Sequence, residues 1–430
     1  MTASTPHRLA LPARFVHVNP CRLARGTGSI GPAALFQRFD LHTRRLTRSV
    51  VPLSMHKLEV QALDKDLRRH LPATRHDAPL LVFAGVEAIC GGASTRTPSA
   101  LVYRLDRYVE IDHATGAIWA HGYAQPELDA LVAELDARLQ EGQAPRAPHD
   151  HRAPAWQQDA DEHLYAARVR QVQQGLQSRG LHGAALSVGF SRATRADPFD
   201  IYEACVAANP SPYGYVLQDG DFALIGSSPL AFLQLSSGRI HLETDAGTRP
   251  VTRDAAADAA AEADLRVNPK DAIEHQVVVD AELEALAPIA GDTVEAVVSR
   301  EVRRFSHVMH LYSAFEANLS AGLDVTDAIG GLAPAAAVSG HPKRPALALG
   351  CEVEQGERGP YGGVLGLITS PRDADLAVVI RSMWIQQGIA HLRVGGKVVA
   401  GSEPAAEYRE AISKSAFLVN ALASAEGFRP

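Results

Sequence analysis

The chain has 430 residues, of which 46% are hydrophobic and 21% charged, so it is long enough for one large core or two ordinary domains. Its formal net charge of -7 is spread along the chain without a basic patch, which argues against a nucleic-acid partner and favours a small-molecule role. The longest apolar runs, such as Leu80 to Val86, are far shorter than the roughly 18 to 20 residues that span a bilayer, so no transmembrane helix is expected.

The N-terminus and the cysteines carry no targeting or redox signal. The first twenty residues contain basic side chains but no continuous apolar segment followed by a small-residue cleavage site, so a cytoplasmic location is expected. Cys21, Cys90, Cys205 and Cys351 lie far apart and form no C-x-x-C pair. We therefore expect buried, reduced thiols.

The first 150 residues are predicted to mix α and β structure. Strand-like runs at 79–86 and 100–105 alternate with polar turns, and residues 127–140 have the apolar spacing of a helix. Residues 143–156, rich in Pro, Ala and charge, lack hydrophobic periodicity and predict an exposed linker. We expect 1–150 and 157–425 to be two portions of one fold.

After the linker the pattern predicts many short strands with few helices. A helix is expected over 165–177, followed by strands at 184–190, 213–218, 222–227, 232–237 and 240–244. Long helical patterns cover 271–286 and 404–422, with strands at 364–370, 376–385 and 390–400 between them. No glycine-rich nucleotide-binding motif follows a strand. This order favours an α+β sandwich over a doubly wound parallel sheet.

Both long helices carry acidic residues at helical spacing. Asp271 and Glu274 share one face of the first helix, and Glu407, Glu410 and Lys414 share one face of the second. Acid pairs of this kind are usually a solvated surface. The alternative is a site where four oxygen donors meet around Mg2+, which takes few protein carboxylates and leaves positions for an anionic substrate.

Nine short segments of the second half occur in a characteristic order. They are NPSPYGYVL (209–217), IGSSP (225–229), AGTRP (246–250), NPKDAIEHQVVVD (268–280), SHVMHLYS (306–313), SGHPK (339–343), RGPYGG (358–363), VIRS (379–382) and GSEPAAEYREAISK (401–414). Together they resemble the chorismate-utilising enzymes: anthranilate synthase component I, aminodeoxychorismate synthase component I, and isochorismate and salicylate synthases. The resemblance covers about 160–425 and implies an α+β sandwich of two large, mainly antiparallel sheets flanked by helices.

The resemblance also implies a site for chorismate or a close analogue. Mg2+ would be held against the ring carboxylate by Asp271, Glu274, Glu407 and Glu410. The substrate-binding residues would be Tyr361, Arg381, Gly395, Lys414, Thr248 and Gly363. An arginine fork and a magnesium ion suit a dianionic ligand, since each neutralises charge that is costly to desolvate. His310 would lie beside the substrate, although a lone histidine is more often a core residue.

Several reaction-step positions of the family are replaced. Leu230 stands in place of the S-P-E glutamate, which acts as a general acid, and leucine cannot donate a proton. Gly183 replaces the water-activating lysine of isochorismate and salicylate synthases, and Ala246 replaces the nucleophilic lysine of aminodeoxychorismate synthases. Ala337 replaces a threonine, so a hydroxyl near the ring is lost.

Two ionisable residues, Lys397 and His341, stand where the family has small ones. They are either exposed or substrate-contacting groups, or they supply replacement acid/base chemistry. A lysine near a metal and other cations has a lowered pKa, and the pKa of histidine already lies near neutrality. With His310 they are the candidate catalytic residues.

Two functions remain open. One is a magnesium-dependent lyase or aminating synthase in a specialised pathway, nearest by elimination to anthranilate synthase component I, with ammonia from solution or from a separate glutamine amidotransferase subunit. The other is a binding or regulatory protein that keeps the ligand and metal sites without turnover. PLLVFAGVEA (79–88) stands where the tryptophan-feedback L-L-E-S motif would lie, so feedback by tryptophan is not expected. A homodimer is a further expectation, and neither nucleic acid nor membrane is an expected partner.

Overall fold

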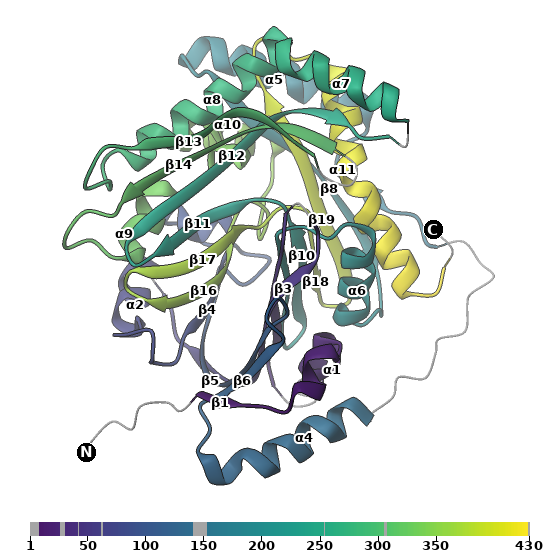
Figure 1. Ribbon diagram of the computed structural model, residues 1–430. Coiled ribbons are helices and arrows are strands. Elements are labelled where there is room, and N and C mark those ends of the chain that lie inside the picture. The colour runs from purple at the N-terminus through teal and green to yellow at the C-terminus, as the bar shows by residue number, and fades with distance from the viewer. Residues whose placement is uncertain are drawn as a thin grey trace.

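The computed structural model describes residues 8–25, 31–41, 43–61, 63–140, 153–252, 254–304 and 308–428. Most of the predicted linker, 143–152, therefore lies outside the described residues, as do Ser306 and His307 of the SHVMHLYS segment. Figure 1 shows layers of strands with helices on their outer faces. The predicted α+β sandwich is confirmed, and every described strand pair named below is antiparallel.

The strands form one continuous set of pairs that folds back on itself. The first arm runs through β8 (Gly183–Ala193), β19 (Ile389–Val398), β18 (Ser382–Gln386), β10 (Phe222–Ser228), β9 (Tyr213–Asp219) and β2 (Ala33–Phe39). The second arm runs through β13 (Glu295–Arg304), β14 (Val308–Asn318), β12 (Arg239–Pro250), β11 (Ala231–Ser236), β17 (Asp373–Val378), β16 (Val364–Ser370) and β4 (Leu80–Ala84).

Two long strands of the N-terminal portion join the arms. β3 (Leu46–Leu58) pairs with β2, and β5 (Ala100–Asp112) pairs with both β3 and β4. Four short strands add to this set. β6 (Ala117–His121) pairs with β5 and β1 (Arg8–Ala10) pairs with β6, while β7 (Gln157–Gln158) and β15 (Gly340–His341) pair with β8. Because β2 pairs with β9 and β4 with β16, strands of the two portions of the chain belong to one sheet.

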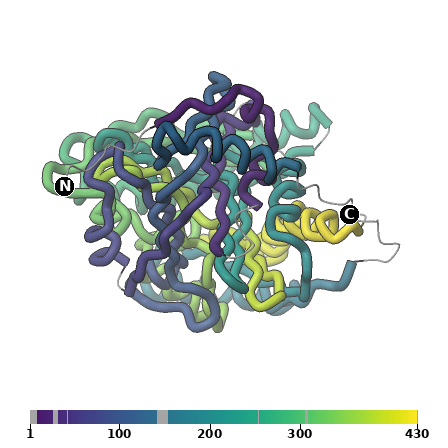
Figure 2. The backbone as a smooth tube through the Cα atoms, turned by 90° about the horizontal axis from the view of Figure 1, so that it is seen from below, coloured from purple at the N-terminus to yellow at the C-terminus, as the bar shows by residue number. Residues whose placement is uncertain are grey.

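Helices cover the outer faces of both arms. The first arm packs against α5 (Glu162–Arg179), α6 (Pro198–Ala208), α10 (Lys343–Glu354) and α11 (Pro404–Ala425). The second packs against α7 (Ala255–Val267) and α8 (Pro269–Leu286), with α9 (Val325–Leu332) against α8. The N-terminal helices are α1 (Pro20–Arg25), α2 (Leu63–His70), α3 (Val86–Ile89) and α4 (Leu128–Gln140). Figure 2 shows from below the purple and blue N-terminal segments nearest the viewer.

One predicted element differs from the structure in a way that matters for the site. Residues 376–385 were expected to form one strand, but they belong to β17 and β18 with a break between these strands. Arg381 lies in that break with φ 48°, a left-handed backbone conformation that a non-glycine residue rarely adopts. The continuous strand is therefore wrong. No helix of the described chain is long and apolar enough to cross a bilayer.

Candidate functional site

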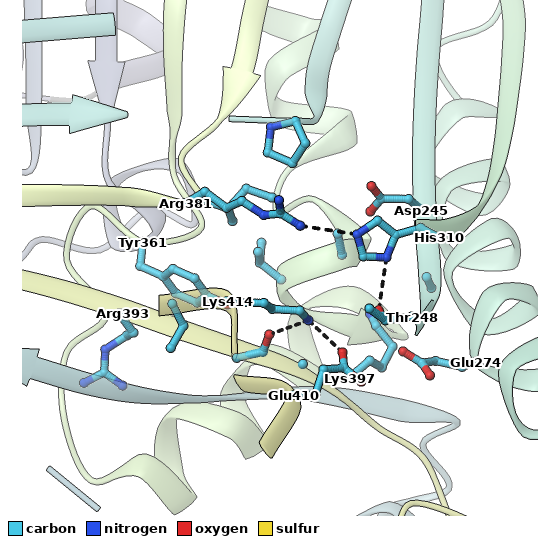
Figure 3. Close-up of a pocket in the computed structure, with 18 residues that line it drawn as sticks. Asp245, Thr248, Glu274, His310, Tyr361, Arg381, Arg393, Lys397, Glu410 and Lys414 are labelled. Atoms are coloured by element: carbon cyan, nitrogen blue, oxygen red, sulfur yellow. Dashed lines mark hydrogen bonds and ion pairs between the residues drawn. The ribbon is translucent and has the colours of Figure 1, made fainter. Parts of the chain in front are cut away.

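A pocket is lined by residues of β12, β14, β19, α8 and α11 (Figure 3). Its charged and hydrogen-bonding lining residues are Asp245, Thr248, Glu274, His310, Tyr361, Arg381, Arg393, Lys397, Glu410 and Lys414. Nine of the thirteen site residues expected from the sequence line it: Thr248, Glu274, His310, Tyr361, Arg381, Gly395, Lys397, Glu410 and Lys414. The pocket lining thus contains both positively charged and acidic side chains.

The acidic wall is built by the N-terminal turns of two helices. Asn268 caps α8 by accepting from the N–H groups of Lys270 and Asp271, and Pro269 occupies the first helical position. Glu403 caps α11 in the same way, with Pro404 first. The four predicted carboxylates, Asp271, Glu274, Glu407 and Glu410, therefore lie in the first two turns of their helices. The partial positive charge of a helix N-terminus stabilises carboxylates there.

Positive side chains lie among these carboxylates. The Lys270 ammonium is 2.7 Å from Glu274 Oε2 and 3.3 Å from Glu407 Oε1. Arg249 donates to Asp271 Oδ2 at 2.6 Å, and Lys414 donates to Glu410 Oε1 at 2.8 Å. Burial first, and then repulsion from Glu410, raises the pKa of Glu274 and raises the pKa of Glu407 to about 7. Burial and mutual repulsion thus both oppose the ionisation of Glu274 and Glu407.

The carboxylate cluster has some features of a divalent-cation site and lacks others. Within the described ranges, no three His, Cys, Asp or Glu side chains are placed closely enough to hold a metal ion, and Lys270 lies between two of the carboxylates. Asp271 Oδ1, however, is buried and has no hydrogen-bond partner in the described chain. A Cβ on Gly396 would lie 3.4 Å from Glu407 Oε2, so glycine keeps the space above the carboxylates open. The carboxylate oxygens are donors of the kind that Mg2+ prefers, and in this structure the Lys270 ammonium lies between Glu274 and Glu407.

A hydrogen-bonded chain on the opposite side links Thr248, His310 and Arg381 (Figure 3). Arginine can only donate, so the Arg381 guanidinium donates to His310 Nε2 at 3.3 Å. His310 Nδ1 then carries the proton and donates to Thr248 Oγ1 at 3.0 Å and to Gly247 O at 3.3 Å. Burial lowers the pKa of His310 to about 4. A neutral His310 thus orients the guanidinium.

Tyr361, Lys414 and Gly395 lie around the same pocket. Lys414 donates to Gly395 O at 3.0 Å, which ties α11 to β19. A Cβ on Gly395 would lie 2.2 Å from Leu186 O, so only glycine fits at this position, where β19 pairs with β8. Burial raises the pKa of the Tyr361 phenol, which keeps it a neutral donor. Gly363 is not in the lining, because it packs against Ala84 and Gly85 instead.

The two candidate acid/base residues lie in different places. Lys397 is 3% exposed, lines the pocket and donates to Ala336 O, and its burial lowers its pKa to about 8. His341 is not a lining residue. Its ring stacks on His182 with centroids 5.1 Å apart, and its Nδ1 is 3.5 Å from Glu284 Oε2. Lys397 alone of the pair therefore faces the pocket.

The replaced family positions are filled by apolar packing. Leu230 is buried in the core cluster that includes Phe232 and Val378, and only its neighbour Pro229 reaches the pocket. Ala246 and Ala337 line the pocket. A Cβ on Gly183 would lie 3.2 Å from Val277, so this position is closely packed. None of these residues can exchange a proton.

Sequence reasoning missed two charged lining residues. Asp245 stands inside β12, and aspartate is depleted in strands, which is the signal that could have found it. Arg393 donates to Asp159 Oδ2 at 2.9 Å and to Ser187 Oγ at 3.0 Å. Ser187 in turn contacts the buried Glu354, which pairs with the fully buried Arg358 at 2.7 Å. This network fixes the backbone behind the pocket.

Comparison with known proteins gives consistent matches. Residues 29–420 match the family model described as chorismate binding enzyme. Anthranilate synthase component 1 of Streptomyces coelicolor is 32% identical over 403 residues, which cover 89% of this chain and 76% of the relative. The crystal structure of anthranilate synthase component I from Streptococcus pneumoniae has a TM-score of 0.73 at 23% identity, covering 91% of this chain and 92% of that one. MenF, the menaquinone-specific isochorismate synthase of Escherichia coli, has a TM-score of 0.78 at 18% identity, covering 98% and 96%.

Proposed function

The chain belongs to the family of chorismate-binding enzymes, and we propose that it is a magnesium-dependent enzyme that acts on chorismate or a close analogue. The observation that carries the proposal is the juxtaposition of a cationic wall, with Arg381 and Lys414, and an acidic wall on α8 and α11 in one pocket. A dicarboxylate ligand is matched by both walls: a guanidinium can bind one carboxylate through two hydrogen bonds, and a cation held by the acidic wall can bind the other.

Binding of the substrate is assigned to groups that already face the pocket. Arg381, held by neutral His310, and the Tyr361 hydroxyl receive one carboxylate, and Lys414 lies beside the other. Mg2+ would be held by Glu274 and Glu410, with Asp271 and Glu407 behind them, and when bound it neutralises the ring carboxylate. Lys270 supports this assignment, since an ammonium already lies where positive charge is needed.

Lys397 is assigned the role of proton donor to the departing ring oxygen. Its pKa of about 8 leaves it mostly protonated at neutral pH, yet makes the proton easier to transfer than that of an exposed lysine. His341, the second candidate, is assigned no contact with substrate, because it lies outside the pocket lining. His310 acts by positioning Arg381.

The proposed reaction class is amination or elimination, nearest to anthranilate synthase component I, in a specialised pathway. Several of the most similar curated relatives carry that name, such as the one from Pseudomonas aeruginosa, 31% identical over 342 residues. Ammonia would come from solution or from a glutamine amidotransferase subunit. Leu230 supports altered chemistry, since an apolar core side chain stands at the family's acid position.

A second candidate is a binding or regulatory protein that holds the ligand without turnover, and the buried Leu230 favours it. Calorimetric titration with chorismate, with and without Mg2+, separates ligand binding from its absence. Product analysis by mass spectrometry, with and without ammonium salt, then separates the two functions. Binding with consumption supports the enzyme, whereas binding without consumption supports the second candidate. No binding would refute both.

A further inference from the structure

Asp245 enters the pocket because of a bulge in β12. The register pairs Asp245 with Tyr312 and Thr248 with His310, and it shifts by one residue between Ala246 and Thr248. In a regular strand, residues three apart point to opposite faces. The extra residue, Gly247 with φ 74°, restores the same face for Asp245 and Thr248, and both line the pocket. The backbone is thus shaped to present this carboxylate.

Asp245 differs from the other carboxylates of the pocket lining. Glu274 is paired with Lys270 and Glu410 with Lys414. In the part of the chain that the structure describes, the Asp245 carboxylate forms no hydrogen bond or ion pair within 4.0 Å, although it lies beside His310 and near Arg381 in Figure 3. Its negative charge opposes the effect of burial on the pKa of His310, His275 and Arg381. Asp245 therefore interacts electrostatically with its neighbours but keeps its oxygens available.

An ionised carboxylate can only accept hydrogen bonds, so Asp245 needs a donor on the ligand. The two carboxylates of a chorismate-like ligand are repelled by it. The remaining donors are the ring hydroxyl and an incoming ammonia or water molecule. The ring hydroxyl can instead accept a hydrogen bond from Lys397, which lies on β19 and not on β12. The incoming nucleophile is therefore the group that best matches Asp245.

We propose that Asp245 is a catalytic carboxylate that accepts a proton from the ammonia or water molecule adding to the substrate ring. The inference rests on the proposed function and adds a base to its acid. As the bond from nitrogen or oxygen to a ring carbon forms, the ring double bonds shift and the carbon–oxygen bond of the hydroxyl breaks. The departing hydroxide takes a proton from the Lys397 ammonium and leaves as water. The new ammonium or oxonium gives its extra proton to Asp245.

The test compares Asp245→Asn, Asp245→Glu and the parent for kcat and KM with chorismate, Mg2+ and an ammonium salt. Asparagine keeps the shape and a hydrogen-bond acceptor but cannot take the proton. Asp245→Asn is expected to lower kcat by about 10² or more, the usual contribution of a positioned acid or base, with KM for chorismate changed less than about threefold. Asp245→Glu keeps a carboxylate and should recover part of kcat.

The matched control is Glu243→Gln, which removes a negative charge two residues away in the same strand but outside the pocket lining. Its kcat should stay within about threefold of the parent, with folding of every variant checked by thermal denaturation. An Asp245→Asn variant that keeps the parent kcat overturns the proposal. A raised KM with unchanged kcat also overturns it, because Asp245 would then be a binding contact. A parent that consumes no chorismate refutes the proposed function itself, and the base role with it.

Discussion

Replacing Lys397 with methionine should make the protein more stable and less active. Lys397 is only 3% exposed in the folded chain. Methionine keeps the apolar part of its side chain and removes the buried charge. Burial depresses the pKa of this lysine from 10.5 to about 8. At about 1.4 kcal/mol for each pH unit, the buried ammonium costs about 3 kcal/mol at neutral pH.

The sign of the pH dependence follows from the direction of that change. Between about pH 8 and 10.5 the unfolded chain binds a proton that the folded chain does not, so stability rises with pH across this window. Below about pH 8 the cost is fully present. Lys397→Met should therefore raise the free energy of unfolding at pH 7 by up to about 3 kcal/mol and remove this part of the pH dependence.

Turnover should change in the opposite direction. If Lys397 donates the proton to the departing oxygen, kcat falls at least about tenfold in Lys397→Met, while ligand affinity changes less. In the parent, kcat should fall as the pH rises through about 8. Chemical denaturation and steady-state kinetics at several pH values measure both effects, with the exposed Lys65→Met as the matched control. Normal turnover together with unchanged stability would refute the assignment of a buried, catalytic ammonium.

Four further variants probe the two walls of the pocket. Glu274→Ala or Glu410→Ala should abolish magnesium-dependent ligand binding while the fold stays intact by circular dichroism; unchanged Mg2+ affinity in both would refute the metal assignment. Arg381→Ala should weaken a dicarboxylate ligand by about 2 to 5 kcal/mol in calorimetry, and parental affinity would place this side chain outside the site. Lys270→Met should raise Mg2+ affinity by about tenfold, since it removes an ammonium from between Glu274 and Glu407; weaker Mg2+ binding would show that Lys270 supports the site instead of competing for it.

The two helices that carry the acidic residues of the site, α8 and α11, were predictable from local sequence. Pro269 and Pro404 follow the capping residues Asn268 and Glu403, and three-residue spacing puts each acidic pair on one face. What local sequence does not contain is the docking of α11 opposite α8. The contact of Lys270 with Glu407, residues far apart in the chain, depends on that docking.

The misses have identifiable physical causes. The run 376–385 is apolar except for Arg381 and Ser382, and its residue types do not mark the left-handed backbone of Arg381, which lies between β17 and β18 and faces the pocket. Asp245 could not be placed from the sequence because the alternation of inward and outward side chains in β12 is interrupted by a bulge at Gly247, two residues after it. His341 follows the lining residues Ala337 and Val338 closely in the sequence but does not line the pocket. The pairing of the short strand β15 with β8 places its ring against His182 instead.

The central claim is tested most directly by incubating the purified protein with chorismate, Mg2+ and an ammonium salt, beside the Glu410→Ala variant, and following chorismate and its products by mass spectrometry. The account predicts that chorismate is consumed by the parent only when Mg2+ is present, and that the variant leaves it intact. Chorismate that persists unchanged with the parent under these conditions would contradict the claim.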